Sequence, residues 1–509
     1  MSILAKRVAL VVLVVVAIVA AGCGGGYGGS GTPPPPPKFS NASLVGQYAF
    51  SMSGTELCAG SNSFFTRAGT FTADGKGNIV GGLEDINVCS GVATLGFTGG
   101  RYFINPNGRG TLSLVNSTGT TNYSITLPST TQGFIAQTDV DATASGSFQR
   151  QNPAAFSNPA IAGGYAFDFK GVDVAASVVS AASFVGRFDA DGAGHISSGL
   201  FDSNIAGTLS GQQTFPAGAF YQVDTNGDGS AFGRGTAKIA GQDFAFYVVD
   251  ATRLKFVGTS FPSAFAGDAV AQQNIAFNDA SLGGSFAFLI SGSTSAGSIA
   301  TGGRFTADGA GKITNVVADE NDSGTITLLP NGTVTGSYAV DANQFGGGTL
   351  TWTDTKSGTF SFIFYLISPT QAVFQETDSK IVSDGTFSAQ TTTPISAAAL
   401  AGDYAFSWSG AGTDAEDFVG QFSLTSSGNL TGKIDFNEFA TGRQFFDIPL
   451  SGSITLGGDG TQDNTATFNL QITPADTFQF TAYVVNQNTV FLVGVDTTRV
   501  LIGTMTRQP

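Results

Sequence analysis

Apolar and polar residues alternate along most of this chain. Tyr48, Phe50 and Met52 alternate with small or polar residues, and Tyr404 begins the same pattern again much later. An alternation with a period of two predicts a β-strand with one buried face. From residue 42 to residue 152 the pattern predicts eight strands joined by short connections, near 46–53, 64–73, 78–86, 95–104, 109–116, 120–127, 131–138 and 144–150.

The predicted strands belong to a unit that occurs four times. Each copy opens with Gly, any residue, an aromatic residue, Ala and Phe, starting at Gly46, Gly163, Gly284 and Gly402. The phenylalanines of the next element recur every 117 residues, at Phe71, Phe188, Phe305 and Phe422. An Asp-x-Asn follows in each copy, at Asp85 and Asn87, Asp202 and Asn204, Asp319 and Asn321, and Asp435 and Asn437. Each copy closes on a glutamine, at Gln151, Gln273, Gln390 and Gln508. This self-similarity predicts four domains, over residues 42–152, 158–274, 279–391 and 397–509.

We expect an all-β fold of four tandem antiparallel meanders, each with eight strands. Closing such a meander into a β-barrel removes both exposed sheet edges, so a barrel is favoured. A two-sheet β-sandwich accounts for the same periodicity and stays open as the alternative. The Gly-x-aromatic opening at Gly46 and the eight-stranded meander resemble the lipocalin and avidin style of barrel, although Tyr48 stands where lipocalins usually carry Trp.

The N-terminus predicts export and a lipid anchor. Lys6 and Arg7 precede an apolar run that is too short for an ordinary membrane-spanning helix, and the run ends in Ala-Ala-Gly-Cys at Cys23. This ending resembles the lipobox of bacterial lipoproteins, and the resemblance implies a signal peptide over residues 1–22 and acylation of Cys23. The Gly- and Pro-rich residues 23–41 are expected to form an extended tether. The lack of Asp after Cys23 favours the outer membrane of the cell envelope, with the lipid anchor holding the protein to it.

Composition supports the fold and excludes one class of partner. The chain has 70 Gly and 44 Phe, and 31 of its 37 acidic residues are Asp, which gathers in turns whereas Glu favours helices. The formal net charge is −15. Such an acidic chain repels phosphates, so nucleic-acid binding is not expected. Nothing in the sequence calls for a cofactor.

Candidate catalytic residues are few. His195 is the single histidine, and it follows a turn where the other copies carry Asn78 or Lys312, so we interpret it as a solvent-facing turn residue. Without a second histidine, an imidazole-rich metal site and Ser-His-Asp chemistry are both rejected. The Asp-x-Asn pairs are interpreted mainly as caps of backbone groups where a strand turns, and alternatively as ligands for a sugar or cation at a barrel mouth. We therefore expect no enzymatic activity.

One segment has part of the pattern of a calcium loop. Asp224, Asn226 and Asp228 offer oxygen atoms at the first, third and fifth positions, with Gly229 at the sixth. The twelfth position is Gly235 instead of a bidentate Glu, and no flanking helices are predicted. A polar hairpin turn is therefore favoured over a metal site.

The two remaining cysteines, Cys58 and Cys89, test the predicted topology. In a meander the first strand and the third strand both end at the same mouth, which brings these residues within reach of a disulfide. An exported compartment permits that bond. Two free buried thiols are the alternative.

The functional prediction is a surface-exposed lipoprotein with a structural or adhesive role, in which four modules project from the membrane as a rigid stalk. The whole chain resembles uncharacterised tandem-repeat lipoproteins of bacterial envelopes, a likeness that implies no activity. The alternative is a protein that binds a small ligand or a glycan at the barrel mouths. An apolar cavity within one copy would favour the binding protein, and interiors filled by aromatic residues would favour the stalk. The sequence does not identify a protein, glycan or small-molecule partner.

Overall fold

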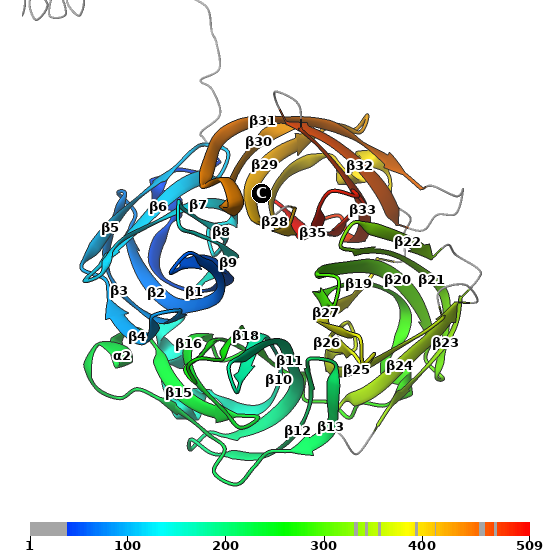
Figure 1. Ribbon diagram of the computed structural model, residues 1–509, viewed down its shortest axis with the longest axis horizontal. Helices are drawn as coiled ribbons and strands as arrows, with labels where there is room; N and C mark the ends of the chain where they lie inside the picture. The colour runs from blue at the N-terminus through cyan, green and yellow to red at the C-terminus, as the bar shows by residue number, and fades with distance from the viewer. Residues whose placement is uncertain are drawn as a thin grey trace, which may run out of the picture. The chain divides into compact units, whose positions relative to one another are not determined.

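Each copy of the repeat folds into its own antiparallel β-sheet (Figure 1). The computed structural model describes residues 38–329, 334–341, 345–354, 358–391, 395–412, 414–457, 464–472 and 476–509. Lys38–Pro509 form one compact unit. The predicted signal peptide, Cys23 and most of the predicted tether lie outside the described residues.

The first sheet closes into a barrel because its second and third strands pair with each other. Its strands are β1 (Val45–Cys58), β2 (Ser61–Asp74), β3 (Asn78–Val88), β4 (Gly91–Gly96), β5 (Gly99–Ile104), β6 (Arg109–Asn116), β7 (Gly119–Ser129), β8 (Gln132–Asp139) and β9 (Ala142–Arg150). The chain leaves the regular strand at Phe97 and Thr98, so β4 and β5 together fill the place of the fourth predicted strand. Phe39 is buried in this barrel's core, so the barrel begins before residue 42.

The second sheet is closed by a single bridge instead of the strand pairing that closes the first sheet. Its strands are β10 (Ala162–Ala175), β11 (Val178–Asp191), β12 (Ile196–Ile205), β13 (Thr208–Thr214), β14 (Phe220–Val223), β15 (Arg234–Ile239), β16 (Gln242–Asp250), β17 (Arg253–Gly258) and β18 (Ala264–Ala271). Its edge strand β14 meets the residue that precedes β12 through an isolated bridge between Phe220 and His195. The short helix α2 (Gly227–Ala231) lies between β14 and β15.

The third sheet closes like the first, through pairing of β20 with β21. Its strands are β19 (Gly283–Thr294), β20 (Ser298–Asp308), β21 (Lys312–Asp322), β22 (Thr325–Leu329), β23 (Val334–Val340), β24 (Gly347–Asp354), β25 (Gly358–Ser368), β26 (Gln371–Glu376) and β27 (Ile381–Ala389). Its fourth strand is also divided, into β22 and β23.

The fourth sheet is a closed barrel in which the fourth strand is continuous. After the helical turn α3 (Ala397–Leu400) come β28 (Gly402–Ala411), β29 (Ala415–Leu424), β30 (Asn429–Glu438), β31 (Arg443–Leu456), β32 (Thr465–Ile472), β33 (Asp476–Asn486), β34 (Thr489–Gly494) and β35 (Val500–Arg507). The prediction of antiparallel barrels, favoured over sandwiches, is confirmed by these sheets.

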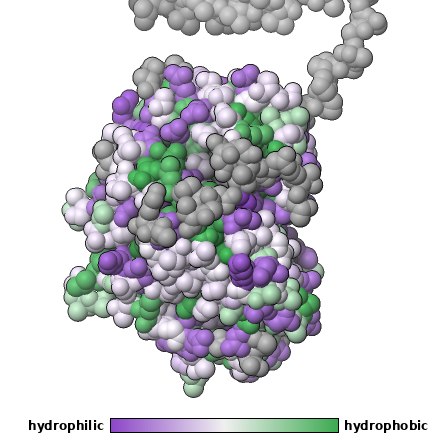
Figure 2. Space-filling view, turned by 90° about the vertical axis from the view of Figure 1, so that its right-hand side faces the viewer, coloured by the Kyte–Doolittle hydropathy of each residue, from purple (hydrophilic) through white to green (hydrophobic). Residues whose placement is uncertain are grey.

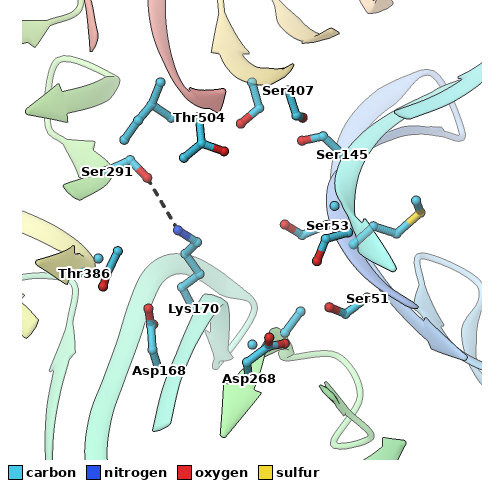
Figure 3. A pocket seen from close by; sticks show the side chains of 18 of the residues that line it. Ser51, Ser53, Ser145, Asp168, Lys170, Asp268, Ser291, Thr386, Ser407 and Thr504 are labelled. Atoms are coloured by element: carbon cyan, nitrogen blue, oxygen red, sulfur yellow. Dashed lines mark hydrogen bonds between the residues drawn. The ribbon is translucent and has the colours of Figure 1, made fainter. Parts of the chain in front are cut away.

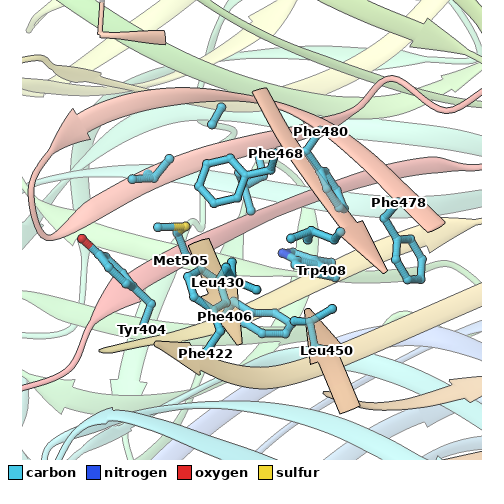
Figure 4. Packing of buried hydrophobic residues seen from close by; sticks show 14 of the residues in the cluster. Tyr404, Phe406, Trp408, Phe422, Leu430, Leu450, Phe468, Phe478, Phe480 and Met505 are labelled. Carbon is cyan, nitrogen blue, oxygen red and sulfur yellow. The ribbon is translucent and has the colours of Figure 1, made fainter. Parts of the chain in front are cut away.

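The repeated aromatic residues form the barrel cores. The opening aromatic residue of each copy packs against the phenylalanine of the next element, with ring centroids 5.6 Å apart for Tyr48 and Phe71 and 5.7 Å apart for Tyr404 and Phe422. In the fourth barrel, Trp408 lies 4.7 Å from Phe480 between ring centroids (Figure 4). Large buried side chains occupy the interior of all four barrels. In the part of the chain that the structure describes, this filling weighs against ligand binding inside a single barrel.

The first and last strands of each barrel approach closely at a glycine of the last strand. A Cβ atom at Gly146 would collide with the carbonyl oxygen of Ser51 on the neighbouring β1. Gly267, Gly385 and Gly503 occupy the equivalent positions in the other barrels and are equally crowded. Only glycine permits this approach, because any side chain would push the two strands apart.

The four barrels form a closed ring (Figure 1). Buried apolar clusters join barrel one to barrel two, two to three, and three to four. A fourth cluster closes the ring, in which Phe134 and Ala136 of barrel one meet Ala405 and Val419 of barrel four. The prediction that the four modules project as a stalk is therefore wrong. A stalk needs free ends, whereas here the last barrel buries apolar surface against the first.

The one face of the molecule seen in Figure 2 has a mixed surface. Hydrophobic residues lie there in small patches between hydrophilic ones. Large contiguous apolar patches are the usual mark of a protein-docking surface. In the coloured part of this view the hydrophobic patches stay small and interrupted.

Candidate functional site

A cavity of about 420 Å³ lies at the centre of the ring, and all four barrels contribute to its wall. The first and last strands of each barrel face it: β1 and β9, β10 and β18, β19 and β27, and β28 and β35 (Figure 3). Because side chains alternate along a strand, the residues between the core aromatic residues point out of the barrel. Ser51 and Ser53, for example, lie on either side of the core residue Met52 and reach the cavity.

Each barrel offers four side chains at equivalent wall positions, two on its first strand and two paired with them on its last strand. Barrel one supplies four serines, and barrel four supplies mainly hydroxyls. In order, the four sets are Ser51, Ser53, Ser145 and Ser147; Asp168, Lys170, Ala266 and Asp268; Leu289, Ser291, Asp384 and Thr386; and Ser407, Ser409, Ile502 and Thr504. Charged residues therefore occur only in the sets of barrels two and three.

A fifth charged residue, Lys255 of β17, completes this polar wall. The side chain of Lys255 is 1% exposed. Its Nζ atom donates to Ser51 Oγ and Ser147 Oγ of barrel one, each at 3.1 Å, and lies 3.3 Å from Asp268 Oδ1. Burial lowers the pKa of Lys255, and the attraction of Asp268 only partly offsets this. Lys255 thus joins barrels one and two at the edge of the cavity.

Lys170 reaches across the ring toward barrel three. Its Nζ atom lies 3.4 Å from Asp384 Oδ1 and 3.5 Å from Ser291 Oγ. Although burial works against its charge, the carboxyls of Asp384 and Asp168 raise the pKa of Lys170. Its side chain is 47% exposed because it projects into the cavity, so its ammonium group is available to a ligand.

Among the described residues, Asp168 has neither an ion pair nor a hydrogen-bond partner for its Oδ1 atom, whereas Asp384 has at least the ion pair with Lys170. The Oδ1 atom of Asp168 is also shielded from solvent. Burial raises the pKa of Asp168 well above its usual range, and repulsion from Asp384 and Asp268 adds to this, while Lys170 opposes it. Asp268 differs because Lys255 and Arg253 together outweigh its burial and lower its pKa. The pKa values of these two paired carboxyls, on β10 and β18, are therefore shifted in opposite directions.

The arrangement suits binding better than catalysis. Among the described residues, no group of three or more His, Cys, Asp or Glu side chains has the geometry to hold a metal ion. His195, the candidate base of any acid–base chemistry, lies on the surface with its Nδ1 atom 2.8 Å from Asp191 Oδ2 and does not line the cavity. The cavity instead combines unlike charges on one side with hydroxyls on the other, as expected of a site for a small polar molecule.

The sequence did not identify these five charged residues. Three of them lie on β10 and β18, the second copy's counterparts of the first and last strands predicted for the first copy, at positions that point out of the barrel. One clue was available. When the four copies are superimposed, the positions of Lys170 and Lys255 hold a charge in one copy only.

The predicted disulfide is present. Cys58, the last residue of β1, is bonded to Cys89, which directly follows β3, and their Cα atoms are 6.1 Å apart. The two cysteines lie at the same end of the first barrel, as the meander requires. This excludes the alternative of two free thiols in this structure.

The segment with the partial calcium pattern forms the turn between β14 and β15. Asp224 Oδ2 accepts a hydrogen bond of 3.0 Å from Arg234 Nη1, so its carboxylate faces a cationic side chain. Asn226 precedes α2 and Asp228 lies exposed in its first turn. The segment does connect two antiparallel strands as a hairpin, as expected, and its turn includes the short helix α2.

The Asp-x-Asn pairs hold the barrels together. Asn87 Nδ2 donates to the carbonyl oxygens of Gly258 and Ser263 in barrel two, and Asn437 Nδ2 donates to those of Asp139 and Ala142 in barrel one. Asn204 and Asn321 do the same at the other two interfaces. The interpretation of the asparagines as backbone caps therefore holds, but the carbonyls that they cap belong to the neighbouring barrel. The aspartates instead bind side chains of the neighbouring barrel.

The closing glutamines make a second set of contacts between barrels. Gln151 Nε2 donates to Val248 O at 2.7 Å, and Gln508 Nε2 donates to Leu127 O at 2.7 Å across the seam between barrels four and one. In the second copy this residue is Gln272, whose Nε2 atom donates to Leu366 O at 2.6 Å. The choice of Gln273 is wrong because two consecutive glutamines stand there and the sequence does not distinguish them.

One barrel end contains a smaller cavity of about 270 Å³, lined by residues of the fourth barrel. Arg499 lies there between Glu416, at 3.0 Å from Oε2, and Asp476, at 2.6 Å from Oδ2. Burial raises the pKa of Glu416 to about 7, and Arg499 opposes this shift. These charges satisfy one another, so this mouth is a weaker candidate than the central cavity.

Comparison with known proteins does not assign a family. No family model and no curated protein matches the chain. The chain is similar to the solved structure of the isotype 1 transferrin binding protein B (TbpB) from serogroup B Neisseria meningitidis, with 10% identity over 76% of this chain and 83% of that one and a TM-score of 0.22. It is also similar to intact Ap-TbpB (N and C lobes), with 8% identity over 74% and 84% and a TM-score of 0.18. Both TM-scores lie well below 0.5, so neither alignment establishes a shared arrangement of barrels.

Proposed function

We propose that this protein is a lipid-anchored component of the bacterial cell envelope whose ring of four barrels binds a small polar molecule in its central cavity, without catalysis. One observation carries the proposal: the cavity wall has charged side chains in barrels two and three where the other barrels have mainly serine, threonine and aliphatic residues. The asparagine and glutamine contacts between barrels recur in all four copies, whereas these charges do not, so the repeated contacts alone do not account for them.

The anchor is the part of this proposal that rests on sequence. The apolar run before Cys23 and the small residues that lead into it match a lipobox. No helix among the described residues is long and apolar enough to span a bilayer. Metabolic labelling with a fatty-acid analogue should mark the wild-type protein, and Cys23→Ser should abolish the label. A label that survives this substitution would exclude the anchor.

The binding role is tested by filling the cavity. We expect a screen of small polar metabolites against the full chain in detergent to find ligands that raise the melting temperature, since a ligand that binds the folded state stabilises it. Ser409→Trp places a bulky side chain on the neutral side of the cavity and should abolish the shift. Ser427→Trp, in an exposed turn of the same barrel, is the matched control and should keep it. Equal shifts in both variants would place the ligand elsewhere.

A structural or adhesive role is the second candidate. The filled barrel interiors favour it, because they leave the modules rigid. If no ligand in the screen distinguishes the Ser409→Trp variant from the wild type, this role becomes the better account of the ring.

A further inference from the structure

Three carboxyls and three cationic side chains surround the central cavity, and Asp168 is the carboxyl for which no cation lies within ion-pair distance among the described residues. Lys255 and Arg253 both lie close to Asp268, Arg253 at 2.7 Å from Oδ2. Lys170 lies beside Asp384. Asp168 remains, with the like-charged Asp268 directly opposite it on β18 and Asp384 facing it from barrel three. Lys170 attracts Asp168 but pairs directly with Asp384, and Asp168 Oδ1 has no hydrogen-bond partner among the described residues, so an ionised Asp168 is stabilised when a further cation joins it.

We infer that the cavity binds a small organic cation, a protonated primary amine on an uncharged polar body, with Asp168 as its counter-ion. This inference rests on the proposed binding function and specifies its ligand. The net charge of −15 agrees with it, because an acidic protein raises the local concentration of cations. Lys255 is buried, and its ammonium group is held by Ser51 and Asp268. It therefore does not compete with the ligand for Asp168.

The opposite wall indicates what the rest of the ligand is like. Barrels one and four supply hydroxyls there, including Ser53, Ser145 and Ser407, together with the apolar side chains of Phe134 and Phe491. Hydroxyls donate to and accept from neutral polar groups, and aromatic side chains pack against aliphatic or ring carbons. A polar, uncharged body therefore fits this side while its ammonium group faces Asp168.

Lys170 limits the ligand to one ammonium group. Its Nζ atom projects into the same cavity and would repel a second positive charge. The same atom donates to a neutral ligand oxygen without leaving Asp384. A monoamine is thus preferred over a diamine.

The probes for the test are matched pairs that differ only in charge. Glucosamine is compared with glucose, and 4-aminobutan-1-ol is compared with butane-1,4-diol, by calorimetry on the full chain in detergent. We expect at least one amine of the two to bind saturably, and its uncharged partner to bind at least roughly tenfold more weakly, as expected for one charge-assisted contact.

Asp168→Asn keeps the shape of the side chain and removes its charge. We expect it to weaken amine binding by roughly tenfold to a hundredfold. The Asp168→Asn variant should fold normally, because it removes a carboxyl that has no ion-pair partner. An unchanged or higher melting temperature of the variant would confirm that it folds. Asp228→Asn changes the net charge equally at an exposed site and should leave binding unchanged. Amine binding by the wild type should also weaken as the pH falls, because Asp168 becomes protonated. The charged groups around Asp168 are Asp384, Asp268, Lys170, Lys255 and Arg253.

Two results would overturn the inference. Equal binding of amine and uncharged partner, insensitive to Asp168→Asn but lost in Ser409→Trp, would keep the cavity as a binding site and exclude the cation. Failure of both amines to bind would also exclude it, while the metabolite screen decides separately whether the cavity binds another molecule.

Discussion

Tyr247 of the second barrel donates a hydrogen bond of 2.7 Å from its hydroxyl to Asp85 Oδ2 of the first. The same contact joins Tyr365 to Asp202 at 2.6 Å and Tyr483 to Asp319 at 2.7 Å. Three successive interfaces thus bury one tyrosine–aspartate pair each. The three aspartates differ in the other groups that donate hydrogen bonds to them. Removing the tyrosine hydroxyl should therefore cost a different amount of stability at each interface.

Tyr365→Phe should destabilise the ring more than Tyr247→Phe. Asp85 keeps Arg234, at 2.7 Å and 2.9 Å, when its tyrosine is removed. Asp202 keeps only the backbone N–H of Gln212. We expect a loss of about 2 kcal/mol for Tyr365→Phe and about 1 kcal/mol for Tyr247→Phe. Denaturant unfolding of the two variants measures this, and an equal loss would mean that Arg234 adds nothing at its interface.

The seam between barrels four and one should depend on Arg109. Thr126 occupies the tyrosine position there, and Arg109 pairs instead with Asp435 and with Asp447, at 2.6 Å from Oδ1. Arg109→Met should cost about 3 kcal/mol or more because it leaves Asp435 buried without its cation. Hydrogen exchange should show the loss of protection in β6 and β30 first.

A second substitution separates charge from packing at this seam. Adding Asp435→Asn to Arg109→Met should recover part of the lost stability, since no buried charge then remains unpaired. Lys433→Met is the control, because Lys433 lies 3.5 Å from the exposed Asp447 and contributes little. A Lys433→Met effect as large as that of Arg109→Met would contradict this account.

Removal of the Cys58–Cys89 disulfide should destabilise the first barrel alone. The bond closes a loop with a sequence separation of 31. Constraint of the unfolded chain by such a loop is worth about 3 kcal/mol. Cys58→Ser with Cys89→Ser should therefore reduce hydrogen-exchange protection in β1 to β3 and leave the fourth barrel unchanged. Two alkylatable thiols in native, never-reduced protein would show that the bond does not form.

The protein should lose stability as the pH rises from about 5 to about 8, in part through Glu376. Burial raises the pKa of Glu376 to about 8, although the Ser383 hydroxyl donates to it at 3.0 Å. A carboxyl with a raised pKa in the folded state favours folding while it is protonated. That contribution is lost between its unfolded pKa near 4.5 and its folded pKa. Glu376→Gln should flatten this decline by a few kcal/mol, measured as unfolding free energy against pH. An unchanged slope would assign the decline to other carboxyls.

The sequence alone determined the strands, the number of copies and the contents of the cores. Alternation with a period of two places Phe50, Phe71 and Trp408 on buried faces, because a strand turns successive side chains to opposite sides. The same local rule placed Cys58 and Cys89 at one mouth. These properties depend on residues that are close along the chain or within one repeat.

The tertiary structure alone decided what the outward-facing residues do. Alternation sends Ser51, Asp168 and Asn87 out of their barrels but does not say whether solvent or another barrel lies there. Asn87 donates to backbone carbonyls of barrel two, and Asp168 is repelled by the charge of Asp384 in barrel three. Such contacts join residues more than 150 positions apart and exist only because the last barrel packs on the first. The closed ring, its central cavity and its unmatched carboxyl follow from that packing, which no local pattern encodes.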